Sequence, residues 1–268
     1  VIYTVTPTDN TNSCIGDPFV ITVTVQSEPR GANDVVSECS DIALAYDLQA
    51  NVNSPSGNSM DANFSWVAAD NPNVTGESLV AQSGDIINDI ITNTSATDQT
   101  VTYTVTPTET VNGCVGDDFT ITVTVRAEPL GVDDAKSICS NTTTLYDLQN
   151  NINTLGNNRT SNFNWVAADN PNVTGESTTP QILPLINDLL RNFTNVDQDV
   201  VYTVTPTGIN GCVGDPFDVT VTVQPEPVGV DDTDIACSDI ALAYDLQNNV
   251  NVSGNGVSSD FSWVAASN

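Results

Sequence analysis

The feature that most limits the fold of this chain is a hairpin-like stretch that occurs three times. The middle copy, residues 101–125, reads VTYTVTPTETVNGCVGDDFTITVTV. Val101, Tyr103 and Val105 alternate with threonines, and the same period of two returns over Phe119–Val125. Alternating β-branched residues predict two half-buried strands, and the Pro, Asn, Gly and Asp between them predict the connecting turn. The other copies lie at residues 2–25 and 201–223.

The repeat extends beyond the hairpin and has a period of 98 to 100 residues. Three further positions recur at this spacing, occupied by Cys14, Cys114 and Cys212, by Cys39, Cys139 and Cys237, and by Trp66, Trp165 and Trp263. The sequence WVAADNPNVTGES stands unchanged at 66–78 and 165–177. Solenoid units run roughly 20–50 residues, so this period predicts an array of independent sandwich domains.

The domain boundaries are predicted at three Glu-Pro-x-Gly segments, which begin at Glu28, Glu128 and Glu226. Residues 30–128 and 130–226 are then complete units, 1–28 is the final hairpin of another, and 228–268 holds the opening strands of a fourth. Joints this short predict domains placed end to end with limited freedom. We interpret the chain as a window onto a longer array rather than a discrete filament subunit.

Within residues 30–128, a seven-stranded unit is predicted, with its first three strands at Asp34–Cys39, Ile42–Asn51 and Phe64–Ala69, its fifth at Ile86–Thr92 and the hairpin last. The counterpart of the fifth, Ile182–Phe193, has helical spacing that Pro184 interrupts. Short strands, turn signals between them and a Trp in the third strand are typical of an immunoglobulin-like sandwich. The predicted fold class is all-β, in tandem sandwich domains, with core residues Leu48, Trp66, Tyr103 and Phe119.

The quoted motifs resemble a known family. An x-Cys-Ser strand, a central x-Trp-x-Ala strand and an ending YTVTPT…NGCxGD…VTVTV are similar to PKD-like repeats of Bacteroidota surface adhesins. In the first unit these are Cys39-Ser40, Trp66 and 103–108, with Gly113-Cys114 and 123–125. The resemblance, to SprB-like gliding adhesins exported by type IX secretion, covers the whole chain. It implies a secreted, surface-attached structural role at the bacterial cell surface.

Charge and length exclude several partners. The chain has 34 acidic and five basic residues and no His, for a net charge of −29. Nucleic acid and anionic lipid carry the same sign and are excluded as partners. No apolar run approaches the roughly 20 residues of a membrane span, so no direct membrane insertion is expected.

Catalysis is not expected. A chain without His lacks the commonest general base, and neither a nucleophile elbow nor a phosphate loop is present. The adjacent carboxylates at 117–118, 133–134 and 231–232 do not face one another across a cleft, as a glycosidase requires. The threonine rows could form a flat face for ice or sugar, but threonine is also an ordinary residue for the solvent face of a sheet.

The acidic residues suggest calcium as the only candidate cofactor. Asp133 and Asp134 lie in a joint, and Asp215 lies at the tip of the hairpin beside it. Carboxylates and carbonyls suit a hard cation, and binding would relieve self-repulsion. The alternative interpretation is solubilising charge and aspartates in turns.

The six cysteines never form a CxxC pair, so they are interpreted as disulfide formers. Three schemes compete. Sequence neighbours could pair (Cys14–Cys39, Cys114–Cys139, Cys212–Cys237), each unit could close on itself (Cys39–Cys114, Cys139–Cys212), or Cys39 could join Cys212 in the next unit.

Strand geometry helps to choose. Cys39 lies about eight residues into its domain, roughly 25 Å from the start at about 3.3 Å per residue, whereas Cys114 is at a hairpin tip near the start. A disulfide needs Cα atoms within about 7 Å, which favours the staple Cys39–Cys212 between units.

The sequence therefore predicts a structural stalk segment of a giant surface adhesin, supporting attachment and gliding motility. Its partners are expected to be neighbouring repeats and, through other regions, outer-membrane anchoring or motility machinery. The alternatives are a polysaccharide- or protein-binding repeat module, whose long loops at 54–63 and 70–78 would make the contact, and a self-assembling filament subunit.

Overall fold

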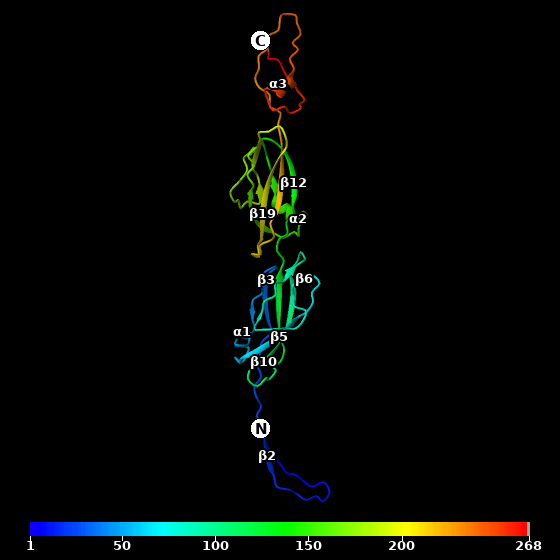
Figure 1. The fold of residues 1–268 in the computed structure, drawn as a ribbon, viewed down its shortest axis with the longest axis vertical. Helices are drawn as coiled ribbons and strands as arrows, with labels where there is room; N and C mark the ends of the chain where they lie inside the picture. The colour runs from blue at the N-terminus through cyan, green and yellow to red at the C-terminus, as the bar shows by residue number, and fades with distance from the viewer. Residues whose placement is uncertain (267–268) are drawn as a thin grey trace. The chain divides into compact units, whose positions relative to one another are not determined.

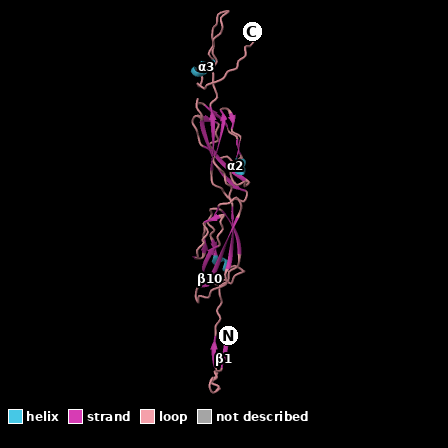
Figure 2. Cartoon of the chain, turned by 90° about the vertical axis from the view of Figure 1, so that its right-hand side faces the viewer, coloured by secondary structure: helices cyan, strands magenta, loops and turns pink. Residues whose placement is uncertain are grey.

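The alternating stretches form the longest strands of a computed structural model that describes residues 1–266. The chain divides into two compact units, Val1–Ala127 and Glu128–Asn268, which are described separately. Strands outnumber helices in both (Figure 2), and the helices are only five to seven residues long. The N-terminal hairpin pairs β1 (Ile2–Val5) with β2 (Phe19–Thr22) in antiparallel register.

The main sheet of the first unit has the strand order β3-β11-β10-β5-β7. Figure 1 labels its strands β3, β5 and β10. The predicted hairpin is β10 (Gln99–Glu109) and β11 (Phe119–Arg126), which confirms both alternating runs. The strand β5 (Ala62–Ala68) pairs antiparallel with β10, and β7 (Gln82–Ser83) lies at the edge. The first strand, β3 (Asp34–Cys39), pairs parallel with β11.

The opposite layer of the first unit consists of two-stranded pieces. β4 (Tyr46–Asp47) pairs with β8 (Ile86–Ile87), and β6 (Val74–Thr75) pairs with β9 (Thr92–Asn93). The core lies between the layers, and all four predicted core residues, Leu48, Trp66, Tyr103 and Phe119, are buried in it. The Trp66 and Tyr103 rings meet edge to face with centroids 5.7 Å apart.

Two strand predictions for this unit are wrong in part. Residues 42–51 hold only the two-residue β4, and the chain then turns into the helix α1 (Leu48–Val52). The residues Asp41 and Ala45 have positive φ, which breaks an extended run. Residues 86–92 are divided between β8 and β9, because Asp89 between them turns inward to accept hydrogen bonds from Ser78 and Tyr103.

The second unit repeats this plan. Its main sheet has the order β12-β20-β19-β15, with β12 (Asp134–Cys139), β20 (Phe217–Gln224), β19 (Gln198–Gly208) and β15 (Ser161–Ala167). The opposite layer holds β13 (Thr142–Thr143), β14 (Tyr146–Asp147), β16 (Val173–Thr174), β17 (Leu185–Ile186) and β18 (Leu189–Asn192). The helix α2 (Leu148–Thr154) corresponds to α1. Residues 182–193 hold the two short strands β17 and β18 and no helix, so their helical spacing was misleading.

Residues 228–266 contain one helix, α3 (Leu246–Val252), and none of the opening strands that the sequence predicted. A strand forms only where a neighbour satisfies its backbone groups. The equivalents of β11 and β20 are not among residues 228–266, so the counterpart of β3 has no strand to pair with.

Candidate functional site

The three Glu-Pro-x-Gly joints are each held by an asparagine side chain from the domain that follows. Asn58 donates from Nδ2 to the carbonyl of Glu28 at 2.7 Å, and its Oδ1 accepts from the Arg30 amide at 3.0 Å. An amide side chain can do both at once because it carries a donor and an acceptor. We call this the outer clamp. It recurs with Asn157 on Glu128 and Leu130, and with Asn255 on Glu226 and Val228.

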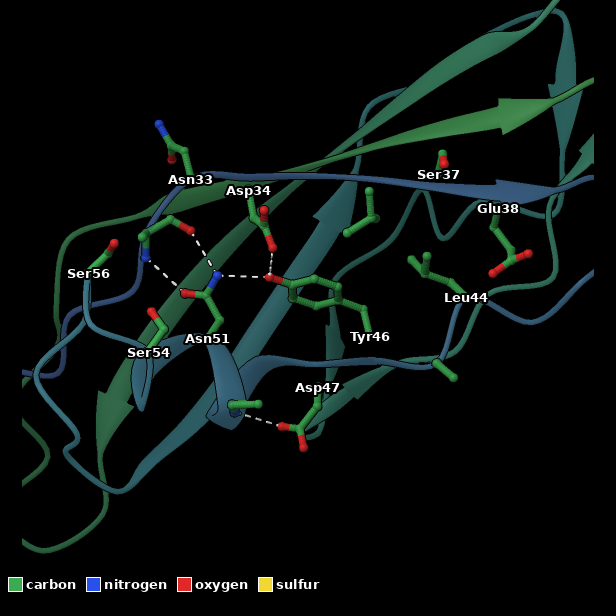
Figure 3. Close-up of a pocket in the computed structure, with 14 residues that line it drawn as sticks. Asn33, Asp34, Ser37, Glu38, Leu44, Tyr46, Asp47, Asn51, Ser54 and Ser56 are labelled. Carbon is green, nitrogen blue, oxygen red and sulfur yellow. Dashed lines mark hydrogen bonds between the residues drawn. The ribbon is translucent and has the colours of Figure 1, made fainter. Parts of the chain in front are cut away.

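A second asparagine holds the same segment two residues further on. Asn51 exchanges two hydrogen bonds with Ala32, from the Ala32 amide at 2.9 Å and to its carbonyl at 3.0 Å (Figure 3). Its Nδ2 also donates to the Tyr46 hydroxyl at 2.8 Å, and that hydroxyl donates to Asp34 Oδ2 at 2.7 Å. This inner clamp recurs as Asn151, Val132, Tyr146 and Asp134, and as Asn249, Val230, Tyr244 and Asp232.

The inner clamp is positioned by the short helix that the sequence reading had taken for a strand. Asp47 caps α1 by accepting from the Ala50 amide at 2.9 Å, and Leu48 enters the core. Gln49 links the helix to β5 through bonds with Met60 and Ala62. The motif Asp-Leu-Gln-x-Asn recurs at 47–51, 147–151 and 245–249. The unchanged Asn was the signal in the sequence, and it was missed because Asn is common in loops.

Glycines let the joint backbone lie against the domain. A Cβ on Gly57 would lie 2.8 Å from the Arg30 carbonyl oxygen, and one on Gly116 would lie 2.0 Å from that of Pro29. A Cβ on Gly31 would lie 2.3 Å from the Phe119 ring. Real Cβ atoms do not come so close, so these positions require glycine. The joint therefore passes between the segment after α1 and the tip of the β10–β11 hairpin, as do its equivalents beside Gly156, Gly214 and Gly131.

The chain is held equally firmly where it leaves the first unit. The Ala127 amide donates to Asp98 at 3.0 Å, and Ala127 is only 1% exposed. Asn93 Nδ2 donates to the Val125 carbonyl at 2.9 Å. The next residue, Glu128, is already held by Asn157 through the outer clamp of the second unit. The adjacent residues Ala127 and Glu128 are thus each hydrogen-bonded within their own unit.

A shallow hollow lies beside the inner clamp, lined by residues of β3, β4 and α1 (Figure 3). Burial, followed by the hydrogen bond to Asp34, raises the pKa of Tyr46 to about 12, so the phenol stays protonated and donates. In the second unit Lys136 Nζ donates to the Leu145 carbonyl in the equivalent hollow. The polar groups that bond here, Asp34, Asp47 and Asn51, bond to the protein itself, as structural residues do.

The cysteines differ in whether they form a disulfide bond. Cys39 and Cys212 are disulfide-bonded, whereas Cys14, Cys114, Cys139 and Cys237 are free thiols. The alternative pairs Cys39–Cys114 and Cys139–Cys212 are therefore not formed, and neither are the pairs of sequence neighbours. Cys39 ends β3 opposite Arg126, one residue before Ala127. Cys212 lies in the hairpin tip whose Gly214 lies against the Pro129 carbonyl.

The aspartates considered for calcium have hydrogen-bond partners within the second unit. Asp133 Oδ1 accepts from the Asp218 amide at 2.8 Å, and Asp134 accepts from Tyr146 and Ala135. Within residues 1–266 no group of three acidic, Cys or His side chains is placed to hold a metal ion, so the structure does not bring these two together with Asp215. Calcium binding stays a prediction.

The chain is therefore an all-β tandem-repeat protein. Each of its joints is hydrogen-bonded to an asparagine of the domain that follows. A family model described as the PKD-like domain matches residues 1–29, 36–129 and 136–227. The chain belongs to the PKD-like domain family. No curated protein matches it.

Solved structures resemble the chain only distantly. PcdhgB3 EC1-4 shares 9% identity at a TM-score of 0.27 over 71% of this chain and 49% of its own length. The human desmocollin-1 ectodomain shares 13% identity at 0.23, over 81% and 45%. Fibronectin(III)-like modules of CbhA from Clostridium thermocellum share 6% at 0.21, over 76% and 96%. The chain spans about half the length of the first two. Within residues 1–266 no helix is long and apolar enough to cross a membrane.

Proposed function

We propose that this chain is a load-bearing stretch of the stalk of an extracellular adhesin, with repeats at 30–128 and 130–226 flanked by parts of two more. The observation that carries this proposal is the fixing of Ala127 and Glu128 by separate units. A hinge needs residues that are free to change φ and ψ, and here both neighbours of the boundary are hydrogen-bonded into a domain. Such a joint resists bending, which is what a stalk requires.

The repetition of the clamps supports a structural rather than a catalytic role. Both asparagines and the clamped backbone groups recur in all three joints with distances between 2.7 and 3.1 Å. A ligand site usually needs one specialised copy, whereas a stalk needs the same joint each time. The chain also lacks His, and the aspartates of the hollow are engaged in caps and clamps.

Small-angle scattering of the whole chain tests the joint. We expect an elongated particle whose maximum dimension stays the same over a range of salt concentrations. Inserting Gly-Ser-Gly-Ser between Ala127 and Glu128 should broaden the distribution of distances, because it adds free residues to the joint. The same insertion between Leu79 and Val80, two exposed loop residues, is the matched control. A compact particle, or identical scattering from both insertions, contradicts the proposal.

We further propose that Cys39 pairs with Cys212. Both are disulfide-bonded, and each lies within its own unit beside the boundary at residues 127–129. A staple there would reinforce the joint covalently and would leave the four free cysteines for equivalent partners in further repeats. Peptide mapping without reductant should recover a Cys39–Cys212 peptide. Recovery of Cys39 joined to any other cysteine rejects the staple.

From the resemblance to Bacteroidota adhesins we also propose that the stalk lies at the bacterial cell surface, is exported by type IX secretion and contributes to attachment and gliding. Neighbouring repeats would be its direct partners, and anchoring or motility machinery would act through other regions. Protease treatment of intact cells tests the location. An antibody to these repeats should lose its signal after treatment, whereas persistence of the signal until cells are lysed would place the repeats inside.

A further inference from the structure

The hollow beside the inner clamp holds a lysine side chain in the second unit and none in the first. In the second unit Lys136 Nζ donates to the Leu145 carbonyl at 2.9 Å. Lys136 lies two positions after Asp134 in β12, and the residue in the same place of β3, two positions after Asp34, is Val36. The first hollow, with a volume of about 530 Å³, therefore lacks the ammonium group that its counterpart of about 450 Å³ contains.

The backbone acceptor of that ammonium is present in both units. Ala45 takes the place of Leu145, one residue before the clamp tyrosine, and it lines the first hollow. Both residues adopt the left-handed conformation, with φ of 49° and 45°. The amide before each bonds to the opposite layer in the same way, at 3.0 and 2.8 Å. The Ala45 carbonyl therefore offers a lysine the same acceptor as the Leu145 carbonyl does.

Two carboxylates flank Val36 on the same strand. Side chains at positions 34, 36 and 38 point to one side because a strand has a period of two, so the Cα atoms of Asp34 and Glu38 lie roughly 7 Å on either side of that of Val36. Figure 3 shows both carboxylates on the side of β3 that faces Tyr46, and both residues line the hollow. Glu38 accepts from the Cys39 amide with Oε1, so Oε2 is available to another donor.

The charge of the two hollows differs in the same sense. The second hollow has one ammonium and two carboxylates, Asp134 and Asp147, and an isoleucine stands at position 138. The first hollow has three carboxylates, Asp34, Glu38 and Asp47, and no basic residue among those that line it. Where valine replaces the lysine, a carboxylate is thus added nearby. The first hollow is left with three negative charges that no cation of its own balances.

The floor of the first hollow is apolar. Val36, Leu44 and Tyr46 are half-buried and pack against the core. Such a surface suits the methylene groups of a lysine, whose ammonium then reaches the acidic rim. A calcium ion instead needs roughly six to eight oxygen ligands around one point. Within residues 1–266 no group of three acidic, Cys or His side chains is placed to hold a metal ion, so the hollow fits an alkylammonium group better than a bare cation.

We infer that the hollow of the first unit binds a lysine side chain of a partner protein. The methylene chain lies over the apolar floor, and the ammonium donates to the Ala45 carbonyl between Asp34 and Glu38. The partner is a protein other than a second copy, because Lys136 is the one lysine of this chain and is already bonded. β3 is the edge strand of its sheet, so the backbone of the partner segment can lie along it. The inference is independent of the proposed stalk, which scattering tests.

An NMR titration of the whole chain tests this binding. The probe is a blocked Ala-Lys-Ala tripeptide, added at a low and constant ionic strength so that charges are not screened. We expect saturable shifts of the Ala45 and Glu38 amide signals. The same peptide with norleucine in place of lysine has no ammonium and should give no shifts, and calcium chloride should not reproduce them. Equal shifts with either probe overturn the inference.

Butylamine separates a partner protein from a free amine. It is the lysine side chain without a peptide backbone, so it cannot pair with the edge of β3 and should bind more weakly than the tripeptide. Equal affinities of butylamine and the tripeptide would reject a protein partner.

Two reciprocal substitutions supply matched controls. Val36→Lys gives the first hollow its own ammonium, as in the second unit, and should abolish the shifts at Ala45. Lys136→Val removes the ammonium from the second hollow and should create shifts at Leu145, weaker than those of the first unit because that hollow has one carboxylate fewer. Circular dichroism checks that each variant is folded, and either folded variant alone decides the matter. Shifts that persist in Val36→Lys, or no new shifts in Lys136→Val, overturn the inference and leave the proposed stalk untouched.

Discussion

At the scale of single residues, asparagine side chains hold the backbone of each joint in one conformation through hydrogen bonds. The joint segment is not part of a sheet, so its amides and carbonyls have no strand partner and need another. Asn58 and Asn51 supply both a donor and an acceptor to the same stretch of chain. Pro29 lies between the clamped residues Glu28 and Arg30. It has no amide hydrogen and a fixed φ, so few backbone groups of the joint are left unpaired.

Removing the donor of one outer clamp should loosen its joint. Asn157→Asp keeps the size and the acceptor, but it places a carboxylate oxygen against the Glu128 carbonyl in place of the 2.7 Å hydrogen bond. We expect a loss of about 1 kcal/mol, or roughly 4–8 °C in Tm for a domain of this size. Asn162→Asp, on an exposed strand position, adds the same charge away from the joint. Equal effects of the two changes on Tm would show that charge alone is responsible.

The buried tyrosines should make the fold sensitive to alkali. Tyr46 has its pKa raised to about 12 by burial and by Asp34, and burial likewise raises the pKa of Tyr103, Tyr146 and Tyr202. The unfolded value is near 10, so the stability linked to these phenols is complete below about pH 10 and is lost as the pH rises through the folded pKa. Tyrosinate absorbance and circular dichroism should therefore change together above pH 10.

Two variants refine this alkaline prediction. Tyr146→Phe should make the second unit less stable at neutral pH, because Asp134 and Asn151 lose their shared partner, and less sensitive to alkali. The change Tyr3→Phe, at an exposed position, is the control. Complete titration of the phenols near pH 10 with an intact circular dichroism spectrum contradicts the prediction.

At the scale of elements, the hairpin strands were predictable and the short helix was not. Val101, Tyr103 and Val105 are buried as the alternation required, since a period of two on a half-buried sheet has only one register. Residues 42–51 are also apolar and alternate weakly, so the pattern alone favoured a strand. The helix depends on Asp47 as cap and on contacts of Asn51 and Gln49 with distant residues, which no local pattern contains.

The candidate site was predictable only in outline. The Pro and Gly of each joint marked a boundary, but the hydrogen bonds that hold it come from residues about 20 and 30 positions later in the chain. The acidic pair Asp133 and Asp134 suggested a metal site. In the structure Asp133 instead accepts a hydrogen bond from the Asp218 amide, and Asp134 accepts one from the Tyr146 hydroxyl. A carboxylate on a turn gives the same sequence signal in both cases.

The capping prediction can be checked on α2, which positions Asn151. Asp147→Ala removes the acceptor for the Asn150 amide and should destabilise the second unit by about 0.5–2 kcal/mol. Asp147→Asn keeps a side-chain oxygen in the cap and should cost much less. The two variants are compared by urea unfolding. If Asn at 147 is as harmful as Ala, the cap is not the reason that Asp recurs there.

At the scale of the whole molecule, negative charge must act against the folded state. The chain carries 34 acidic and five basic residues, and folding brings these charges closer together than they are in the unfolded chain. The hydrogen-bonded clamps and buried cores offset this repulsion without basic partners. A surface of one sign also keeps neighbouring chains apart.

This repulsion gives the last prediction, that salt stabilises the protein. Raising sodium chloride from about 10 mM to 1 M shortens the screening length from about 30 to 3 Å, so the melting temperature should rise. Calcium chloride at the same ionic strength separates screening from binding. An equal rise with both salts means that screening alone acts and that no calcium site is formed. An additional rise with calcium, reversed by chelator, would support the calcium prediction through mass action, and Asp133→Asn should then abolish it. A melting temperature that falls as sodium chloride is added would show that repulsion does not limit the stability of this chain.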